Sequence, residues 1–260
     1  MVQIKARIIN NTNINSNYFH CILEAEGVAR EALPGQFINI KLNDNLDPLL
    51  RRPFSIHKTK GKNIEVLYEV VGQGSKILSQ KKAGELLDII GPLGNGFSVL
   101  GSRLSVIVAG GMGVAPLLFL AEKLTQKAKG KTQNKTTVLI GARDKKQLLC
   151  EKEFMNLGCA VKIATDNGST GLKGRVTDLL KNVLLGIGYE QVAIYACGPK
   201  PMLKEISIVA RNQKIPAQIS LEEHMACGIG ACLGCVVDTR QGFKRVCKDG
   251  PVFMADEIIW

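Results

Sequence analysis

Four cysteines near the C-terminus constrain this chain of 260 residues more than any other part of its sequence. Three lie together in Cys227-Gly-Ile-Gly-Ala-Cys232-Leu-Gly-Cys235, and the fourth, Cys247, follows after a gap. Spacings of four, two and eleven intervening residues begin as a plant-type [2Fe-2S] binding run does, in which thiolates wrap two irons and two sulfides. The intervening glycines suit backbone amides that turn toward cluster sulfur atoms. We therefore predict a metal or cluster loop whose ligands are these four thiols.

A structural zinc site is the alternative, because Cys232-x-x-Cys235 resembles a zinc knuckle and four thiolates also satisfy a tetrahedral ion. Zinc sites usually present two separated pairs of ligands, whereas here three crowd together and one stands apart. The spacing favours the binuclear cluster and leaves zinc as the second hypothesis. A cluster-binding segment of residues 218–260 is too short to fold unaided, so we expect it to pack on the rest of the chain.

The other four cysteines argue against a disulfide framework. They are scattered through apolar contexts typical of strands and helices, at Cys21, Cys150, Cys159 and Cys197. Free cysteine in such places behaves as a small buried hydrophobe, and unpaired cysteines are usual in a reducing compartment. The first 17 residues show no basic-then-apolar export signal. We therefore expect a cytoplasmic protein.

Charge and hydropathy exclude two further classes. The net charge of +11 is spread along the chain without a basic arm or tail, so we expect solvated lysine surface and no nucleic-acid binding. The run Leu104–Ala121 carries no charge and has about the length of a membrane span. Glycines and Pro116 interrupt it, which predicts a buried strand, a glycine turn and a helix, and no membrane span.

Residues 1–100 predict a β-barrel, because short strand-like segments alternate with Gly, Asn, Asp and Pro. The predicted strands are Val2–Ile9, Tyr18–Ala25, Gln36–Leu42, Ile64–Val71 and Leu86–Ile90. Within this predicted barrel, Arg52-Pro53-Phe54-Ser55 combines a guanidinium, a ring and a hydroxyl, which are suited to a planar phosphorylated cofactor such as a flavin. A charged barrel rim is the alternative. Gly74 and Ser75 open a predicted helix, whose N-terminus suits a phosphate.

Residues 101–217 predict a doubly wound α/β domain, since apolar runs of strand length alternate with helical patterns. The strands are expected at Leu104–Ala109, Thr137–Ala142, Ala160–Thr165 and Gln191–Ala196, and the helices at Ala115–Lys127, Lys146–Asn156, Arg175–Leu184 and Lys200–Gln213. Three loops follow strand ends on the edge where ligands bind, namely Gly110-Gly111-Met-Gly113-Val-Ala115-Pro116, Asp166-Asn167-Gly168-Ser169 and Cys197-Gly198-Pro199. Each alone fits close packing, but together they favour a nucleotide site.

The flavin-type, glycine-rich and Cys-Gly-Pro motifs follow one another in the order found in the ferredoxin reductase-like family. The chain resembles this family over its whole length. With Ser220-Leu-Glu-Glu-His-Met-Ala-Cys227 and the cysteines that follow, the resemblance narrows to electron-transfer subunits of B-type dihydroorotate dehydrogenase. It implies that the barrel holds FAD through Arg52–Ser55, Leu67, Tyr68, Glu69, Gly74 and Ser75. It also implies that the α/β domain receives NADH and that the four cysteines hold the [2Fe-2S] cluster.

The resemblance further implies a partner, a separate FMN-containing catalytic subunit that interconverts dihydroorotate and orotate in pyrimidine biosynthesis. A heterotetramer with two copies of each subunit is expected. The alternatives are a flavin subunit of an NADH-dependent ferredoxin or sulfide oxidoreductase, whose members typically carry aspartate where this chain has Cys227, and a zinc-stapled nucleotide-binding module. Asn167 departs from the family pattern, where a second acid is expected, and the aromatic Trp260 is expected to be a packed tail.

Overall fold

The computed structural model describes residues 1–43, 47–128, 135–187 and 191–260. They form two compact units. The first unit comprises residues 1–96, 222–237 and 243–251, and the second comprises residues 97–221, 238–242 and 252–260. All four C-terminal cysteines therefore belong to the first unit. The sequence predicted three consecutive domains with boundaries at residues 100 and 217, whereas the two units are defined by contacts and each combines separate stretches of the chain. The predicted boundaries therefore stay predictions.

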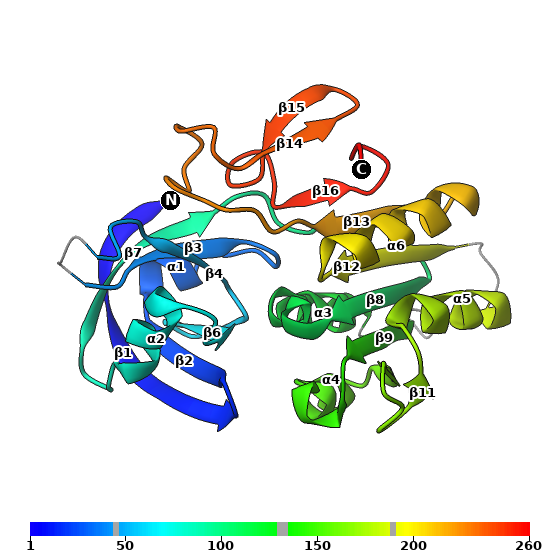
Figure 1. Cartoon of the computed structure of the whole chain (residues 1–260), viewed down its shortest axis with the longest axis horizontal. Coiled ribbons are helices and arrows are strands. Elements are labelled where there is room, and N and C mark those ends of the chain that lie inside the picture. The colour runs from blue at the N-terminus through cyan, green and yellow to red at the C-terminus, as the bar shows by residue number, and fades with distance from the viewer. Residues whose placement is uncertain (44–46, 129–134, 188–190) are drawn as a thin grey trace. The chain divides into compact units, whose positions relative to one another are not determined.

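The first unit contains a seven-stranded antiparallel sheet in the order β4-β3-β7-β1-β2-β6-β5 (Figure 1). Its strands are β1 (Val2–Asn15), β2 (Tyr18–Glu24), β3 (Phe37–Lys41), β4 (Arg52–Ser55), β5 (Lys58–Lys60), β6 (Asn63–Glu69) and β7 (Leu86–Leu93). The sheet curls on itself. Its curvature brings β4 near β6, where the rings of Phe54 and Tyr68 lie with their centroids 5.6 Å apart. Apolar side chains such as Ile38, Ile64 and Ile89 fill the interior. The short helices α1 (Glu26–Ala29) and α2 (Gln73–Gln80) complete this part.

The second unit is an α/β sheet in the order β11-β10-β9-β8-β12-β13-β16. All neighbours pair in parallel except β13 and β16, which are antiparallel. The strands are β8 (Leu104–Gly110), β9 (Lys135–Ala142), β10 (Ala160–Thr165), β11 (Leu172–Lys173), β12 (Val192–Cys197), β13 (Ala217–Ser220) and β16 (Val252–Met254). The α-helices are α3 (Val114–Ala128), α4 (Glu151–Asn156), α5 (Val176–Ile187) and α6 (Lys200–Asn212), with short 3-10 turns η1 (Gly111–Gly113) and η2 (Lys145–Gln147). Strand order reverses between β8 and β12, so the ligand crevice of such a sheet is expected at their carboxyl ends.

The predicted fold class, a β-rich half followed by a doubly wound α/β half, is confirmed, with one helix corrected. The helix expected at Lys146–Asn156 is divided, because Cys150 has a left-handed backbone with φ 62° and α4 begins only at Glu151. A left-handed residue cannot lie inside a right-handed helix. Near the C-terminus, β14 (Val236–Thr239) and β15 (Gly242–Arg245) form a two-stranded sheet, which the sequence did not predict.

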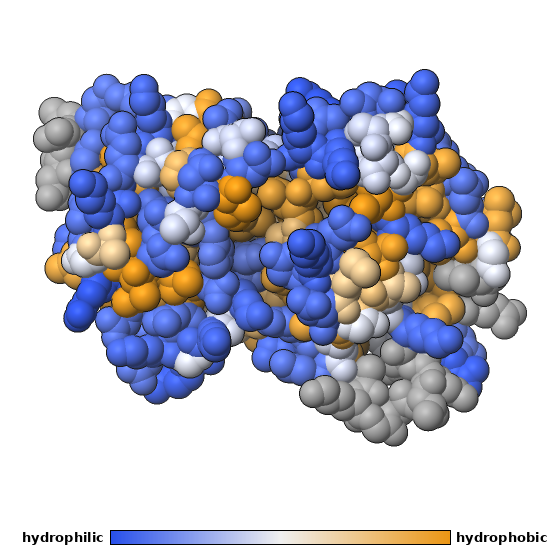
Figure 2. Space-filling model, turned by 90° about the horizontal axis from the view of Figure 1, so that it is seen from below, coloured by the Kyte–Doolittle hydropathy of each residue, from blue (hydrophilic) through white to orange (hydrophobic). Residues whose placement is uncertain are grey.

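The uncharged run Leu104–Ala121 forms strand β8, the turn η1 and the first part of α3, as predicted. Among the described residues, no helix has both the length and the apolar character needed to cross a membrane. Hydrophilic residues cover much of the molecular face in Figure 2, with apolar patches between them.

Candidate functional site

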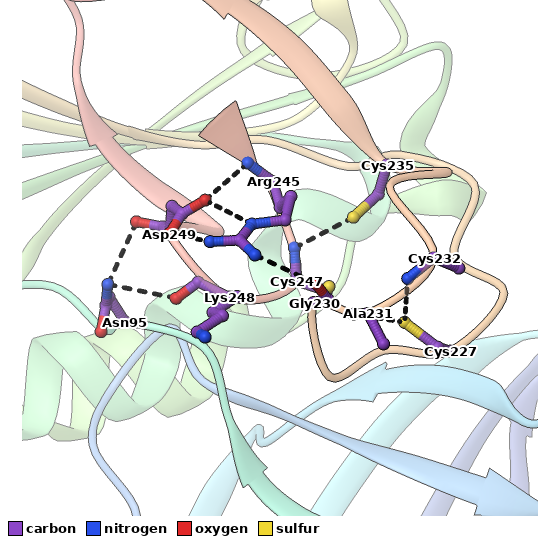
Figure 3. A network of polar contacts seen from close by, with 10 residues as sticks. All are labelled: Asn95, Cys227, Gly230, Ala231, Cys232, Cys235, Arg245, Cys247, Lys248 and Asp249. Carbon is purple, nitrogen blue, oxygen red and sulfur yellow. Dashed lines mark hydrogen bonds and ion pairs between the residues drawn. The ribbon is translucent and has the colours of Figure 1, made fainter. Parts of the chain in front are cut away.

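The side chains of the four C-terminal cysteines interact as two pairs, Cys227 with Cys232 and Cys235 with Cys247. In the first pair the amide of Cys232 donates to the Sγ of Cys227, with a nitrogen–sulfur distance of 3.4 Å. In the second, the amide of Cys247 donates to the Sγ of Cys235, also at 3.4 Å. Figure 3 shows both contacts, with Cys227 and Cys232 on one turn of the loop and Cys235 facing Cys247. The fold thus brings the distant fourth cysteine to the three-cysteine stretch.

Backbone amides converge on the Cys227 sulfur. Besides Cys232, the amides of Ile229 and Ala231 donate to it at 3.5 and 3.3 Å. Burial disfavours the Cys227 thiolate, but the hydrogen bonds from Ile229, Cys232 and Ala231 outweigh burial and lower the pKa of this thiol to about 6. The backbone therefore already stabilises the thiolate form, which is the form that binds a metal.

Cys247 lies in a different environment. Burial and the neighbouring Cys235 thiol raise the pKa of Cys247 to about 12. Both of these cysteines are buried, whereas Cys232 is exposed. A positively charged iron would remove the proton from such a thiol on binding.

The two-plus-two grouping of the thiols can be compared with the needs of a binuclear centre. Among the described residues, no three His, Cys, Asp or Glu side chains gather closely enough to hold a single metal ion. A [2Fe-2S] cluster needs two ligands on each iron, and two pairs of thiols meet that need. Amides directed at sulfur are a further feature of such clusters, because they compensate the negative charge of the thiolates. The residues therefore fit a binuclear cluster.

Strand β3 anchors the start of the cysteine loop. Asn39 is 1% exposed, and its Nδ2 donates to the carbonyl oxygen of Cys227 at 3.3 Å. Gly228 has φ +70° and lies so close that a Cβ atom there would clash with the Asn39 amide. Glycine is thus required at residue 228 both by its backbone conformation and by space.

A second polar network holds the turn that carries Cys247 (Figure 3). Arg245 forms a forked ion pair with Asp249, with Nε–Oδ2 and Nη2–Oδ1 distances of 2.9 and 3.2 Å. Its Nη1 also donates to the carbonyl of Gly230 at 3.0 Å. The guanidinium holds the pKa of Asp249 below its usual range. The Nδ2 of Asn95, just after β7, donates to the carbonyl of Asp249 at 3.1 Å.

The flavin-type residues meet at the start of helix α2. Arg52 begins β4, and Gly74 lies in the first turn of α2. A Cβ atom on Gly74 would lie 3.0 Å from the Arg52 Cγ and 2.9 Å from the Leu42 Cδ1. Glycine therefore allows the helix N-terminus to approach the guanidinium, and the two together provide the positive potential that a pyrophosphate needs.

The Ser75 hydroxyl has a local role. Its Oγ accepts hydrogen bonds from the amides of Val71 and Gly72, at 3.0 and 3.2 Å, and so caps the first turn of α2. The amides of the first turn remain available, because the first i→i−4 bond of the helix is donated by Lys76 to Gly72. The Ser75 hydroxyl is thus engaged with the helix end, and its role in cofactor binding stays a prediction.

The other predicted barrel residues follow β4 and β6. Pro53, Phe54 and Ser55 are half-buried on β4, and Leu67 and Glu69 lie on β6. Tyr68, also on β6, is buried, stacks on Phe19 and donates its hydroxyl to the Asn11 Oδ1 at 3.0 Å. Its side chain is committed to the packing of the sheet.

In the second unit, the two predicted loops beside the switch point pack tightly against each other. β8 ends at Gly110 and β12 ends at Cys197, in parallel register. A Cβ on Gly113 would clash with the Cys197 carbonyl, and one on Gly198 would lie 3.0 Å from the Gly110 nitrogen. Ala115 and Pro116 follow in α3, and Pro199 precedes α6. The glycines thus bring two helix N-termini to the carboxyl edge of the sheet, where a dinucleotide phosphate binds in such folds.

The third loop, after β10, is a turn that is also hydrogen-bonded to the segment after β9. The Asn167 Oδ1 accepts from the Ser169 amide at 2.9 Å, and the Ser169 Oγ accepts from the Lys145 amide at 2.8 Å. An aspartate oxygen can accept the same bond, so the departure at Asn167 preserves the turn. This loop lies on the same edge as the other two but two strands away from β8.

Comparisons with known proteins now bear on this geometry. The family described as the iron-sulfur cluster binding domain of dihydroorotate dehydrogenase B matches residues 222–259. A protein from Desulforamulus reducens, named dihydroorotate dehydrogenase B (NAD(+)), electron transfer subunit, is 42% identical over 98% of this chain and 97% of its own length. The chain belongs to this family of electron transfer subunits. The resemblance inferred from the motifs is confirmed.

Further comparisons agree with membership in the electron transfer subunit family. A subunit of the same name from Caldanaerobacter subterraneus is 41% identical over 99% of both chains. The family described as an oxidoreductase NAD-binding domain matches residues 107–207. A solved structure of an NADH-dependent reduced ferredoxin-NADP oxidoreductase is 31% identical, with a TM-score of 0.85 over 99% of this chain and 90% of its own. The predicted function, electron transfer by an NAD-linked oxidoreductase subunit, is confirmed, and the iron-sulfur interpretation is favoured over zinc.

Sequence reasoning missed the residues that hold the cysteine loop. Asn39, Asn95, Arg245 and Asp249 carry no motif, and Asn39 is 188 residues from Cys227. A signal was available for one pair, since Arg245 and Asp249 are oppositely charged, four residues apart and on both sides of Cys247. The individual cofactor-binding roles predicted for the motif residues stay predictions.

Proposed function

We propose that this chain passes electrons between NADH and the FMN of a dihydroorotate dehydrogenase catalytic subunit, through FAD and a [2Fe-2S] cluster. The observation that carries the proposal is the grouping of four thiols in the first unit, where the loop that begins at Cys227 is bonded to β3 of the sheet that bears Arg52. When bound, the flavin would accept the two electrons of a hydride together and release them one at a time, and the cluster would transfer single electrons.

In this proposal the first hundred residues hold FAD. Arg52 and the first-turn amides of α2 bind the pyrophosphate, because both present positive charge at one place. Phe54 and Ser55 on β4, with the backbone of residues 67–69, orient the ring system. Gly74 contributes by having no side chain, as an alanine there would push against Arg52.

The region of residues 101–217 receives NADH. The loops Gly110–Gly113 and Cys197–Pro199 provide the cradle at the switch point, with Ala115 and Pro116 opening α3. Their close approach leaves backbone amides at the strand ends, where a dinucleotide binds without obstruction from side chains. The turn at Asn167 lies on the same edge.

Residues 218–260 provide the cluster ligands Cys227, Cys232, Cys235 and Cys247. These four thiolates would hold the cluster, which would supply one-electron transfer. The amides of Ile229, Ala231 and Cys232 donate to the Cys227 sulfur and stabilise its negative charge. No orotate pocket is needed in this chain, because the partner carries out that chemistry.

We further propose a cytoplasmic heterotetramer with two copies of each subunit. The family name, electron transfer subunit, supports the existence of a catalytic partner. All eight cysteines, which lie in the described residues, are free of disulfide bonds, and this supports a reducing compartment. Mass measurement of the co-expressed complex tests the stoichiometry.

The main experiment uses Cys232→Ser. The variant is expected to retain FAD reduction by NADH and to lose electron transfer to the catalytic subunit, because one iron loses a thiolate ligand. Cys159→Ala, which removes a thiol far along the chain from the cluster loop, is the matched control and should keep both steps. Equal loss of both steps in Cys232→Ser would give the loop a structural role only and would contradict the proposal.

A second experiment concerns the flavin. Arg52→Ala is expected to weaken FAD binding by removing a charge-assisted phosphate contact, worth about 1.5–3 kcal/mol. Arg30→Ala, an exposed arginine in an ion pair with Glu31, is the control. Unchanged FAD occupancy in Arg52→Ala would show that the pyrophosphate assignment is wrong.

The likeness to an NADH-dependent reduced ferredoxin-NADP oxidoreductase favours one alternative, in which the partner belongs to a ferredoxin-linked enzyme. The two are separated by affinity purification of the tagged chain from cells that express it at natural levels. Recovery of an orotate-binding flavoprotein supports the dihydroorotate dehydrogenase partner. Recovery of a protein that reacts with ferredoxin or NADP instead would favour the alternative.

A further inference from the structure

Arg245 and Asp249, which form the forked ion pair, lie two residues before and two residues after Cys247, the fourth cluster cysteine. The Asp249 carboxylate accepts three hydrogen bonds from Arg245, two from the guanidinium and one from the backbone amide to Oδ2 at 2.8 Å. The amides of Lys248, Asp249 and Gly250 all donate to the Arg245 carbonyl. Cys247 therefore lies inside a closed turn whose two ends are bonded to each other.

The same guanidinium reaches the other cysteine-bearing segment. Its Nη1 donates to the Gly230 carbonyl, midway between Cys227 and Cys232 (Figure 3). Gly230 has φ +86°, and a Cβ there would clash with the aliphatic part of Lys248. The contact between the two segments is thus close in two places. Arg245 is the side chain that bonds to both.

This ion pair also brings opposite charges close to the thiols. The Arg245 and Asp249 side chains are 29% and 30% exposed, so solvent screens them only in part. Together they are neutral, and removing either partner leaves one charge beside the sulfurs. Adding one electron to a [2Fe-2S] cluster makes it more negative without breaking a bond. A nearby positive charge therefore favours the reduced form, and a nearby negative charge disfavours it.

We propose that Arg245 and Asp249 are positioning residues for the cluster, which hold the Cys247 turn against the three-cysteine loop and balance the charge that sets the cluster's reduction potential. This inference rests on the proposed function, because it requires an iron-sulfur cluster at these thiols. It assigns a role to two residues that bind neither iron nor sulfur.

The test measures the reduction potential of the cluster in two variants that break the same ion pair. Asp249→Asn leaves the guanidinium uncompensated and is expected to raise the potential. Arg245→Gln leaves the carboxylate uncompensated and is expected to lower it. Arg30→Gln, the same change of charge at an exposed ion pair in the first unit, is the control and should leave the potential unchanged.

A third variant separates geometry from charge. Arg245→Lys keeps the positive charge but cannot form the planar fork to Asp249 and the bond to Gly230 together. Its potential is expected to stay near that of the wild type, while an iron chelator removes its cluster about 10-fold faster, since a charge-assisted hydrogen bond is lost. If Arg245→Gln does not retain a cluster, Arg245→Lys takes its place, and the potential of Asp249→Asn must lie above it.

The outcomes separate the two proposals. Shifts of opposite sign in Asp249→Asn and Arg245→Gln support the inference. If the ion pair only held the turn in place, both variants would shift the reduction potential in the same direction. Shifts of the same sign, or no shift relative to Arg30→Gln, overturn it while the cluster remains. A wild-type protein that binds no iron and sulfide after anaerobic reconstitution overturns the proposed function itself, and the inference with it.

Discussion

Substitution of Gly228 tests whether the cysteine loop is seated on strand β3 as described. Gly228→Ala meets two obstacles, a backbone with φ +70° and a clash with the Asn39 amide. The left-handed backbone costs about 1–2 kcal/mol. Overpacking against a residue that is 1% exposed costs a further 1–3 kcal/mol or so. We expect the free energy of unfolding to fall by about 2–5 kcal/mol in all.

Two other glycines in residues 218–260 serve to separate the backbone cost from the steric cost. Gly242 has φ +94°, and a Cβ atom there would meet nothing within 4 Å, so Gly242→Ala should cost only the backbone part. For Gly234, a Cβ would make an ordinary contact with the Cys232 sulfur at 3.5 Å, and Gly234→Ala should be within about 0.5 kcal/mol of wild type. Asn39→Ala in the Gly228→Ala background should recover the steric part and leave the backbone part.

The assay is urea denaturation of the cluster-free protein, followed by circular dichroism, with iron content measured after reconstitution. Gly228→Ala should be the least stable of the three single variants and should bind the least iron. If Gly228→Ala proved no less stable than Gly242→Ala, the contact between Asn39 and the loop would be refuted.

The remaining predictions concern the second unit. Gly113→Ala should lower the free energy of unfolding by about 1–3 kcal/mol and weaken NADH binding, because its Cβ clashes with the Cys197 backbone. The control is Gly186→Ala in α5, whose Cβ meets nothing within 4 Å. Equal NADH affinity in the two variants would contradict the loop geometry. The Lys181 hydrogen bond lowers the pKa of Glu205, so this pair stabilises the fold above the unfolded pKa of about 4.3 and loses its effect as pH falls through the lower folded value. Lys181→Met should therefore cost about 0.5 kcal/mol near neutral pH and nothing in acid, and a cost independent of pH in urea titrations would argue against the pair.

Local chemistry in the sequence was enough to predict the main elements and the cluster loop. Thiol spacing and glycines predicted the loop at Cys227, and apolar runs of strand length predicted the parallel strands beside the switch point. These features depend on neighbours in the chain, so they can be read from short segments. The split at Cys150 could not be predicted, since helical periodicity continues through a residue that adopts a left-handed backbone.

The contacts that position the loop depend on tertiary structure instead. Asn39 was predicted only as part of a strand, and its bond to Cys227 follows from the packing of a segment 188 residues away. β13 acquires its antiparallel neighbour β16 from the C-terminal end in the same way. Such pairings leave little trace in one sequence, because many polar residues could fill each role. The two-plus-two grouping of the thiols likewise became evident only from the fold.

A cluster at the paired thiols that receives electrons from NADH is the feature on which the proposed function most depends. The measurement that tests it is low-temperature electron paramagnetic resonance of the anaerobically reconstituted protein, before and after addition of NADH. No signal is expected before NADH, and the signal of a reduced [2Fe-2S] cluster is expected afterwards. A protein that stays silent after NADH, and whose thiols hold zinc without labile sulfide, would contradict it.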